Sequence, residues 1–178
     1  GFCPGVRNAE REILRLREEY PHKQIVIPGY LINNRKYIEY LASLDIQTLG
    51  SGDTIPPGSL VVIRTHGINR HEEEALKKVH HVVDLTCRNV KKVQKIIEEY
   101  SLKGFCVLIT GKKHHPEILG LESYGAYSRV IETTADLDTF FSRDSEEGFP
   151  FPHGINKLLI ISQTTGNRNF FLETVKRV

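Results

Sequence analysis

The chain has 178 residues, with 39% hydrophobic and 26% charged side chains, a composition typical of a globular protein of one large or two small domains. Lysine and arginine number 24 against 22 aspartate and glutamate, and this balance gives no support to a nucleic-acid binder that works by bulk charge. No run of about 18 apolar residues occurs, so the sequence predicts no membrane span.

Short β-branched runs alternate with stretches whose apolar residues recur at helical spacing. In chain order, we expect helix 6–20, strand 24–28, helix 35–44, strand 60–64, helix 70–79, strand 82–85, helix 88–101, strand 104–110, helix 118–124, edge strand 129–132, helix 134–141, strand 157–162 and a terminal helix over 170–178. A Gly-, Ser- and Pro-rich linker at 50–58 and a polar loop at 142–156 join these elements. We therefore predict two similar α/β lobes, 1–87 and 88–178, each with a small parallel sheet flanked by helices.

The cysteines and the chain ends carry further information. Three cysteines, at positions 3, 87 and 106, do not form the even set that a small secreted disulfide scaffold needs, so we expect a reducing compartment. The chain contains no methionine and stops within an amphipathic helical run that lacks a glycine or proline stop signal. We therefore expect the sequence to be part of a longer chain.

Polar residues lie where the predicted strands lead into helices, and ligands bind at such carboxyl ends in open parallel sheets. The junctions carry imidazole, thiol, carboxylate and hydroxyl groups: Thr65-His66-Gly67, Thr86-Cys87, His114-His115-Pro116-Glu117 and Gln163-Thr164-Thr165. Cys3 joins this set if a strand precedes it. Backbone N–H groups at helix starts favour thiolates and phosphate, so the sequence predicts one shared site for an anion.

The cysteines allow several interpretations. Cys106 lies within an apolar strand and is expected to be a small core residue. Cys3 and Cys87 lack the close C-x2-C spacing of structural zinc, and a cysteine nucleophile with a histidine base leaves one thiol without a role. Isolated thiolates from separate loops fit an iron–sulfur cluster, with a third ligand expected beyond Val178.

Five motifs occur in register along nearly the whole chain: Gly1-Phe2-Cys3-x-Gly5-Val6, Thr65-His66-Gly67, Asp84-x-Thr86-Cys87, Gly111-x-x-x-His115-Pro116-Glu117 and Ser162-Gln163-Thr164-Thr165. In order and spacing they resemble the 4-hydroxy-3-methylbut-2-enyl diphosphate reductase family, also called LytB. The resemblance implies a three-lobed, trefoil-like assembly around a central 4Fe-4S cluster. This chain would supply the first two lobes, with Cys3 and Cys87 as two of three cysteine ligands.

The resemblance also implies an activity, the last step of the non-mevalonate isoprenoid pathway. An allylic diphosphate loses its hydroxyl to give isopentenyl and dimethylallyl diphosphate, with electrons from an external donor such as ferredoxin or flavodoxin. Glu117 matches the proton-delivering carboxylate, and Thr164 matches a hydroxyl that organises the substrate and the proton path. His66 and His115 match diphosphate-binding histidines, supported by Gln163. The implied location is the bacterial cytoplasm or a plastid-type compartment.

Three positions depart from the family pattern. Asn33 stands where many members place a further diphosphate-binding histidine, Leu119 replaces a second acidic residue, and Arg88 replaces a common proline. Two alternatives therefore accompany the reductase. One is a degenerate member that binds a diphosphate or a cluster without catalysis, and the other is a thiol hydrolase that uses Cys87 and His66.

Overall fold

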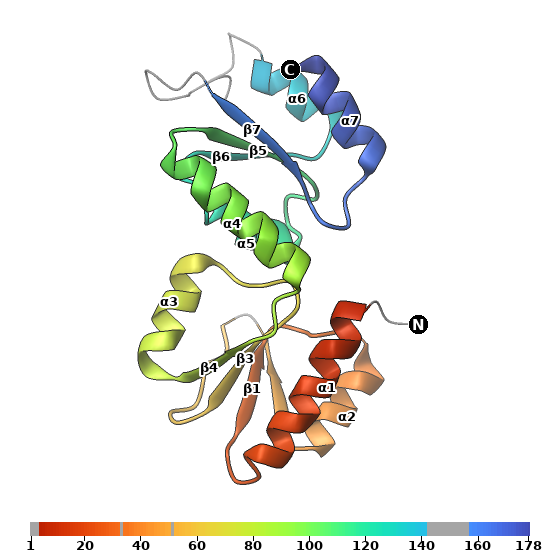
Figure 1. Cartoon of the computed structure of the whole chain (residues 1–178). Coiled ribbons are helices and arrows are strands. Elements are labelled where there is room, and N and C mark those ends of the chain that lie inside the picture. Colours follow the sequence, from red (N-terminus) through yellow and green to blue (C-terminus); the bar gives the residue numbers. More distant parts are fainter. Residues whose placement is uncertain (1–3, 33, 51, 142–156) are drawn as a thin grey trace. The chain divides into compact units, whose positions relative to one another are not determined.

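The structure is a computed structural model that describes residues 4–32, 34–50, 52–141 and 157–178. It divides into two compact units, Gly1–Arg88 and Asn89–Val178. Each unit is a parallel sheet with helices packed against it (Figure 1).

The first unit contains seven elements among its described residues, all strands running parallel. In chain order they are α1 (Pro4–Glu19), β1 (Ile25–Pro28), α2 (Arg35–Ser43), β2 (Ile46–Leu49), β3 (Leu60–Ile63), α3 (Arg70–Val79) and β4 (His81–Asp84). The sheet order is β2-β1-β3-β4. Because side chains alternate along a strand, Leu60 and Val62 pack into the core that includes α1 and α2, and Val61 and Ile63 pack into the core that includes α3.

The second unit has the same construction with a smaller sheet. Its elements are α4 (Arg88–Leu102), β5 (Cys106–Thr110), α5 (Pro116–Glu122), β6 (Ser128–Ile131), α6 (Thr134–Phe141), β7 (Leu158–Ser162) and α7 (Arg168–Arg177). The strands are parallel in the order β6-β5-β7. On one face Leu108 of β5 packs with Leu137 and Phe140 of α6 and with Phe170 of α7, while α4 and α5 lie on the other face (Figure 1).

The predicted parallel α/β architecture is confirmed, and so is the edge position of the strand predicted at 129–132. Two differences stand out. Strand β2, an edge strand that follows α2 directly, was not predicted from the sequence. Helix α5 begins at Pro116, two residues before the predicted start, because His115 caps it and proline fits the first helical position. In the parts of the chain that the structure describes, no helix combines the length and apolar character that crossing a bilayer requires.

Both sheets reverse their winding direction beside a central strand. In the first unit the chain places β2 on one side of β1 and β3 on the other. In the second unit β6 and β7 lie on opposite sides of β5. The loops that leave such neighbouring strands diverge and open a crevice at their carboxyl ends, where α/β proteins bind ligands. The fold therefore marks the ends of β1 and β3, and of β5 and β7, as candidate binding positions.

Candidate functional site

In the first unit, Cys87 is held beside the turn that carries His66. Hydrogen bonding between β3 and β4 continues past the end of both strands: Leu85 N–H donates to Ile63 O, and Cys87 N–H donates to Thr65 O, each at 2.9 Å. Thr65 and His66 form a turn that Gly67 N–H closes by donating to Arg64 O at 3.0 Å. The backbone of Cys87 is thus bonded to the residue directly before His66.

The chain between β4 and α4 is shaped by Asp84. Its carboxylate accepts a bond of 2.9 Å from Thr86 N–H and a second, short bond from the Thr86 hydroxyl. This local turn ends the strand, and Cys87 follows it as the last residue before α4. Cys87 is half-buried and forms no disulfide with the other described cysteine.

Cys106 provides the contrast. It lies at the start of β5 with 1% of its surface exposed, which confirms the expectation of a core residue. Burial raises the pKa of its thiol to about 11, because an anionic sulfur is poorly solvated there. With almost no exposed surface, Cys106 is a packing residue of the second sheet.

In the second unit, the start of α5 presents an imidazole and a carboxylate together. His115 caps the helix, and its Nδ1 accepts the N–H of Glu117 at 3.2 Å. Because Nδ1 is the acceptor, the proton of a neutral ring lies on Nε2, on the far side of the ring. Pro116 fixes the backbone at this entry and places Glu117 in the first turn.

Glu117 is bound to the loop after β7 through both carboxylate oxygens. Thr164 N–H donates to Oε1 at 2.6 Å, and the Thr164 hydroxyl donates to Oε2 at 2.8 Å. Glu117 is only 1% exposed, so water cannot substitute for these donors. A carboxylate with this little solvent access, bonded to a hydroxyl that can both donate and accept, is an arrangement suited to proton transfer.

Gln163 connects the loop after β5 with the loop after β7. Its Oε1 accepts Lys112 N–H at 3.2 Å, and its Nε2 donates to the Thr165 hydroxyl at 3.0 Å. The side chain is buried, and Gly111 packs so closely against it that a Cβ there would lie 2.9 Å from Oε1. A cleft of about 440 Å³ opens at these strand ends, and its lining includes His115, Gln163 and Thr165.

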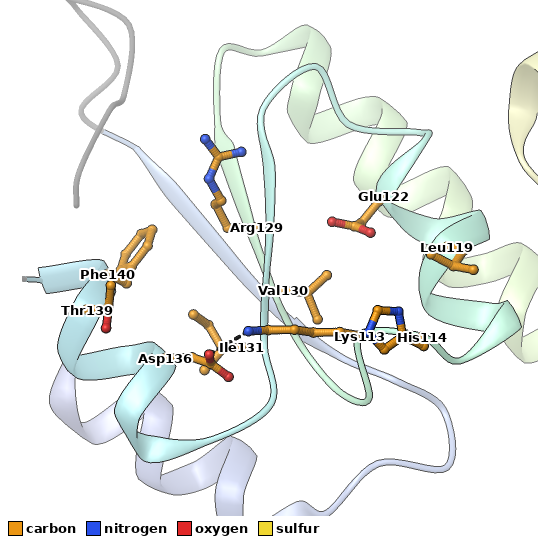
Figure 2. Close-up of a pocket in the computed structure, with 10 residues that line it drawn as sticks. All are labelled: Lys113, His114, Leu119, Glu122, Arg129, Val130, Ile131, Asp136, Thr139 and Phe140. Carbon is orange, nitrogen blue, oxygen red and sulfur yellow. Dashed lines mark hydrogen bonds and ion pairs between the residues drawn. The ribbon is translucent and has the colours of Figure 1, made fainter. Parts of the chain in front are cut away.

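A second cavity, of about 560 Å³, is lined by residues of α5, β6 and α6 (Figure 2). Figure 2 shows Lys113 extending toward Asp136, and the two form an ion pair of 2.6 Å. Burial would raise the pKa of Asp136, but hydrogen bonds from the Lys113 ammonium and from Glu132 N–H and Thr133 N–H hold it at about 2. Lys113 is thus engaged in joining its loop to α6, which argues against a role as a ligand-binding cation.

The structure brings the predicted site residues into two groups. His66 and Cys87 lie together in the first unit. Glu117, Thr164, His115 and Gln163 lie together in the second unit. Cys3 and Asn33 lie outside the described residues. Within the described ranges, no three His, Cys, Asp or Glu side chains gather closely enough to hold a metal ion.

Two residues at these strand ends had no role predicted from the sequence, although Asp84 belongs to one of the five motifs. Asp84 shapes the Cys87 loop through Thr86. Arg64 ends β3 with a half-buried guanidinium. The available signal was a charged residue at or near the end of a predicted strand, two residues before His66 for Arg64 and three residues before Cys87 for Asp84. Buried strands seldom end in a charge without a reason.

Together these features define an α/β protein in which each of the two parallel sheets carries candidate ligand-binding residues at the carboxyl ends of its strands. The sequence profile of the family described as "LytB protein" matches residues 1–178. The chain belongs to this family.

Several proteins of known name are similar to it. A 4-hydroxy-3-methylbut-2-enyl diphosphate reductase of Petrotoga mobilis is 36% identical over 93% of this chain and 54% of its own length. One of Clostridium tetani is 30% identical over 100% of this chain and 26% of its own length. The chain spans 26%, 54% and 59% of the length of three of the curated relatives it matches.

Solved structures agree with the fold. The structure of (E)-4-hydroxy-3-methyl-but-2-enyl diphosphate reductase, described as the terminal enzyme of the non-mevalonate pathway, superposes with a TM-score of 0.80 at 30% identity and covers 99% of this chain and 60% of that one. The Plasmodium falciparum E-1-hydroxy-2-methyl-but-2-enyl-4-diphosphate reductase gives a TM-score of 0.83 at 22% identity, a likeness of fold.

Proposed function

We propose that the protein containing this chain reduces 4-hydroxy-3-methylbut-2-enyl diphosphate to isopentenyl and dimethylallyl diphosphate. Two electrons and two protons enter, the allylic C–O bond breaks, and the hydroxyl leaves as water. The observation that carries the proposal is the buried Glu117 carboxylate bonded to the Thr164 hydroxyl. Family membership and the names of the relatives support it.

In this proposal Glu117 and Thr164 deliver a proton. When Glu117 is protonated, its Oε2–H would donate to Oγ1 of Thr164, and the Thr164 hydroxyl would turn to donate to the substrate. The proton on Oε2 then passes to Oγ1, while the hydroxyl proton of Thr164 passes to the departing oxygen of the substrate. The 2.8 Å bond between these atoms is short enough for such a transfer. The bond from Thr164 N–H to Oε1 fixes the carboxylate so that Oε2 faces the hydroxyl.

The histidines would hold the diphosphate. The Nε2–H group of His115 is a donor suited to a phosphate oxygen, and His66 lies in the turn after β3. We include Asn33 in this set as an uncharged donor. Gln163 would act indirectly, because its amide already bonds Lys112 N–H and Thr165 and so holds the loops of His115 and Thr164 together.

Cys87 fits as one ligand of a 4Fe-4S cluster, since it is half-buried, free of a disulfide with Cys106 and placed at a strand end beside His66. We propose Cys3 as the second ligand and a residue outside 1–178 as the third. When bound, the cluster supplies the electrons and a Lewis-acidic iron for the hydroxyl oxygen.

The same proposal extends to the assembly, the electron donor and the location of the protein. The two units would be the first two lobes of a three-lobed, trefoil-like assembly. The electrons would come from an external carrier such as ferredoxin or flavodoxin. The location would be the cytoplasm of a bacterium or a plastid-type compartment, and the separated cysteines favour a reducing environment.

The test uses the full-length protein, purified and reconstituted without oxygen. We expect about four iron atoms per chain, a broad visible absorption and reduction of the allylic diphosphate. Glu117→Gln should keep the iron and the spectrum but lower turnover by about 10² to 10⁴-fold, because the amide cannot deliver the proton. Glu122→Gln, a carboxylate of the same helix that lines the cavity of Figure 2, should leave turnover close to that of the wild type.

Each other result has a definite meaning. Unchanged turnover in Glu117→Gln would remove the assigned proton donor. A normal cluster spectrum without any reduction of the substrate would support a family member that binds without catalysis. Protein that remains colourless after reconstitution would end the reductase proposal.

A further inference from the structure

Arg64 occupies a ligand-binding position of the first sheet. It follows β3 directly and begins the turn that contains His66. Its guanidinium reaches the end of the neighbouring strand β1, where Nη1 donates to Tyr30 O at 3.3 Å. The side chain therefore spans the carboxyl ends of β1 and β3, the point at which this sheet reverses its winding direction.

The charge of Arg64 is poorly compensated. Among the described residues it takes part in no ion pair, and its Nε is buried without a hydrogen-bond partner. Burial lowers the pKa of Arg64 from its usual value, and the negative charge of Glu72 offsets only part of that effect. A half-buried cation with one long bond to a carbonyl is costly for a folded protein, unless an anion completes its surroundings.

The loop after β1 is built to admit this side chain. Gly29 has a φ of +78°, and a Cβ at this position would lie 2.5 Å from Nη1 and 2.6 Å from Cζ of Arg64. Any larger residue would clash with the guanidinium and adopt an unfavourable backbone conformation. Glycine is therefore favoured by the positive φ of this turn, and a Cβ there would displace the guanidinium from its present position.

We propose that Arg64 is an anion-binding residue that receives the diphosphate group of the substrate at the carboxyl ends of β1 and β3. The identity of the anion rests on the proposed function. A guanidinium presents parallel N–H donors that match two phosphate oxygens, and Nε–H is the donor without a partner in the described structure. With His66 in the same turn, Arg64 gives the first unit a permanent positive charge that does not depend on the protonation of a histidine.

Inorganic diphosphate is the probe, because it needs no cluster and no turnover. In the metal-free full-length protein, it should raise the thermal unfolding midpoint, and its affinity can be measured by calorimetry. Arg64→Gln should weaken this affinity by roughly ten- to hundredfold, since a charge-assisted pair is lost. Arg64→Lys keeps the charge but loses the forked geometry, so its affinity should fall between the two.

Arg15→Gln is the matched control, because Arg15 is an exposed residue of α1 that pairs with Glu12 and Glu19. It should bind diphosphate as the wild type does. Without diphosphate, Arg64→Gln should be as stable as the wild type or more stable, because a poorly compensated buried charge is removed. A purely structural role predicts the opposite, a lower midpoint with unchanged affinity.

In the loaded enzyme, Arg64→Gln should raise KM for the allylic diphosphate with little change in kcat, and the visible spectrum should be that of the wild type. Wild-type affinity for diphosphate in Arg64→Gln would overturn the inference, even if reductase activity is present. If Arg64→Gln does not fold, equal affinity of Arg64→Lys and the wild type would overturn it as well. Diphosphate binding that depends on Arg64, in a protein that does not reduce the substrate, would refute the proposed function and leave this inference standing.

Discussion

Replacing Thr164 by valine tests the contact on which the candidate site depends. Valine has the shape of threonine and keeps the backbone N–H, so the 2.6 Å bond to Oε1 of Glu117 survives. The 2.8 Å bond to Oε2 is lost, and this oxygen stays buried because Glu117 is only 1% exposed. Leaving a buried carboxyl oxygen without its donor, and without water to replace it, lowers the free energy of unfolding by about 1–3 kcal/mol.

Urea titration followed by far-UV circular dichroism measures this loss, and an unchanged slope would show that the unfolded state is unaffected. Thr164→Ser provides the matched variant, because it keeps the hydroxyl and should cost less than about 1 kcal/mol. Thr139→Val, which removes an exposed hydroxyl bonded to Ala135 O within α6, should change stability by less than about 0.5 kcal/mol. Equal losses in Thr164→Val and Thr164→Ser would refute the bond between the hydroxyl and the carboxylate.

Three further outcomes are expected. Asp136→Asn should lower stability by about 1–2 kcal/mol near neutral pH, because the Lys113 ammonium and backbone N–H groups stabilise the charged carboxylate. Since the folded pKa of Asp136 is about 2, below its ordinary value, this contribution is complete above about pH 4 and disappears as the pH falls through 2, which urea titrations across that range will show. Gly111→Ala should destabilise by about 1–3 kcal/mol, because its Cβ would lie 2.9 Å from Oε1 of Gln163, and thermal unfolding measures this. Cys106 should resist iodoacetamide in the native protein and react after unfolding, as peptide mass spectrometry will report, because it is buried with a thiol pKa of about 11.

Each of these has a control or a contrary result. Glu39→Gln removes an exposed ion pair with Arg35 and should leave the free energy of unfolding nearly unchanged. An equal loss of stability in Glu39→Gln and Asp136→Asn would show that the Asp136 ion pair has no special contribution. Wild-type stability of Gly111→Ala would contradict the close packing of that loop. Alkylation of Cys106 at the same rate in native and urea-unfolded protein would show that β5 is not the closed core strand described above.

The parallel α/β fold was predictable because its central strands are unbroken apolar runs in the sequence. β3 reads Leu-Val-Val-Ile, and all four residues are buried, as a strand covered on both faces requires. β2 was missed for an equally physical reason. Its buried residues are Ile46 and Leu49, which are three apart with polar residues between them, so that the pattern resembles a helical repeat. An edge strand with one neighbour needs fewer apolar residues than a central one.

The positions of the candidate residues at strand ends were predictable, but their contacts were not. His66, Cys87, His115, Glu117 and Thr164 all follow predicted strands, and this position alone favours a site. The sequence does not say which strands are neighbours. Only the order β6-β5-β7 brings the loop after β7 to the helix start after β5, and so joins two groups that are 47 residues apart.

The role proposed for Arg64 was not predictable from the sequence, because it depends on the lack of an ion-pair partner among the described residues. The sequence shows a charge at the end of an apolar strand, which solvent or a nearby carboxylate normally satisfies. Whether a counter-charge is present depends on the loop after β1, where Gly29 admits the guanidinium and brings no acid group.

The bond from Cys87 N–H to Thr65 O gives the protein an internal spectroscopic probe. An amide proton is sensitive to small movements of the carbonyl that accepts it, and this carbonyl belongs to the peptide group shared with His66. In the metal-free protein, the ¹⁵N and ¹H resonances of Cys87 should therefore move when an anion is titrated onto the turn, although the anion need not touch the cysteine. A single labelled amide would then record events at an imidazole and at a sulfur together.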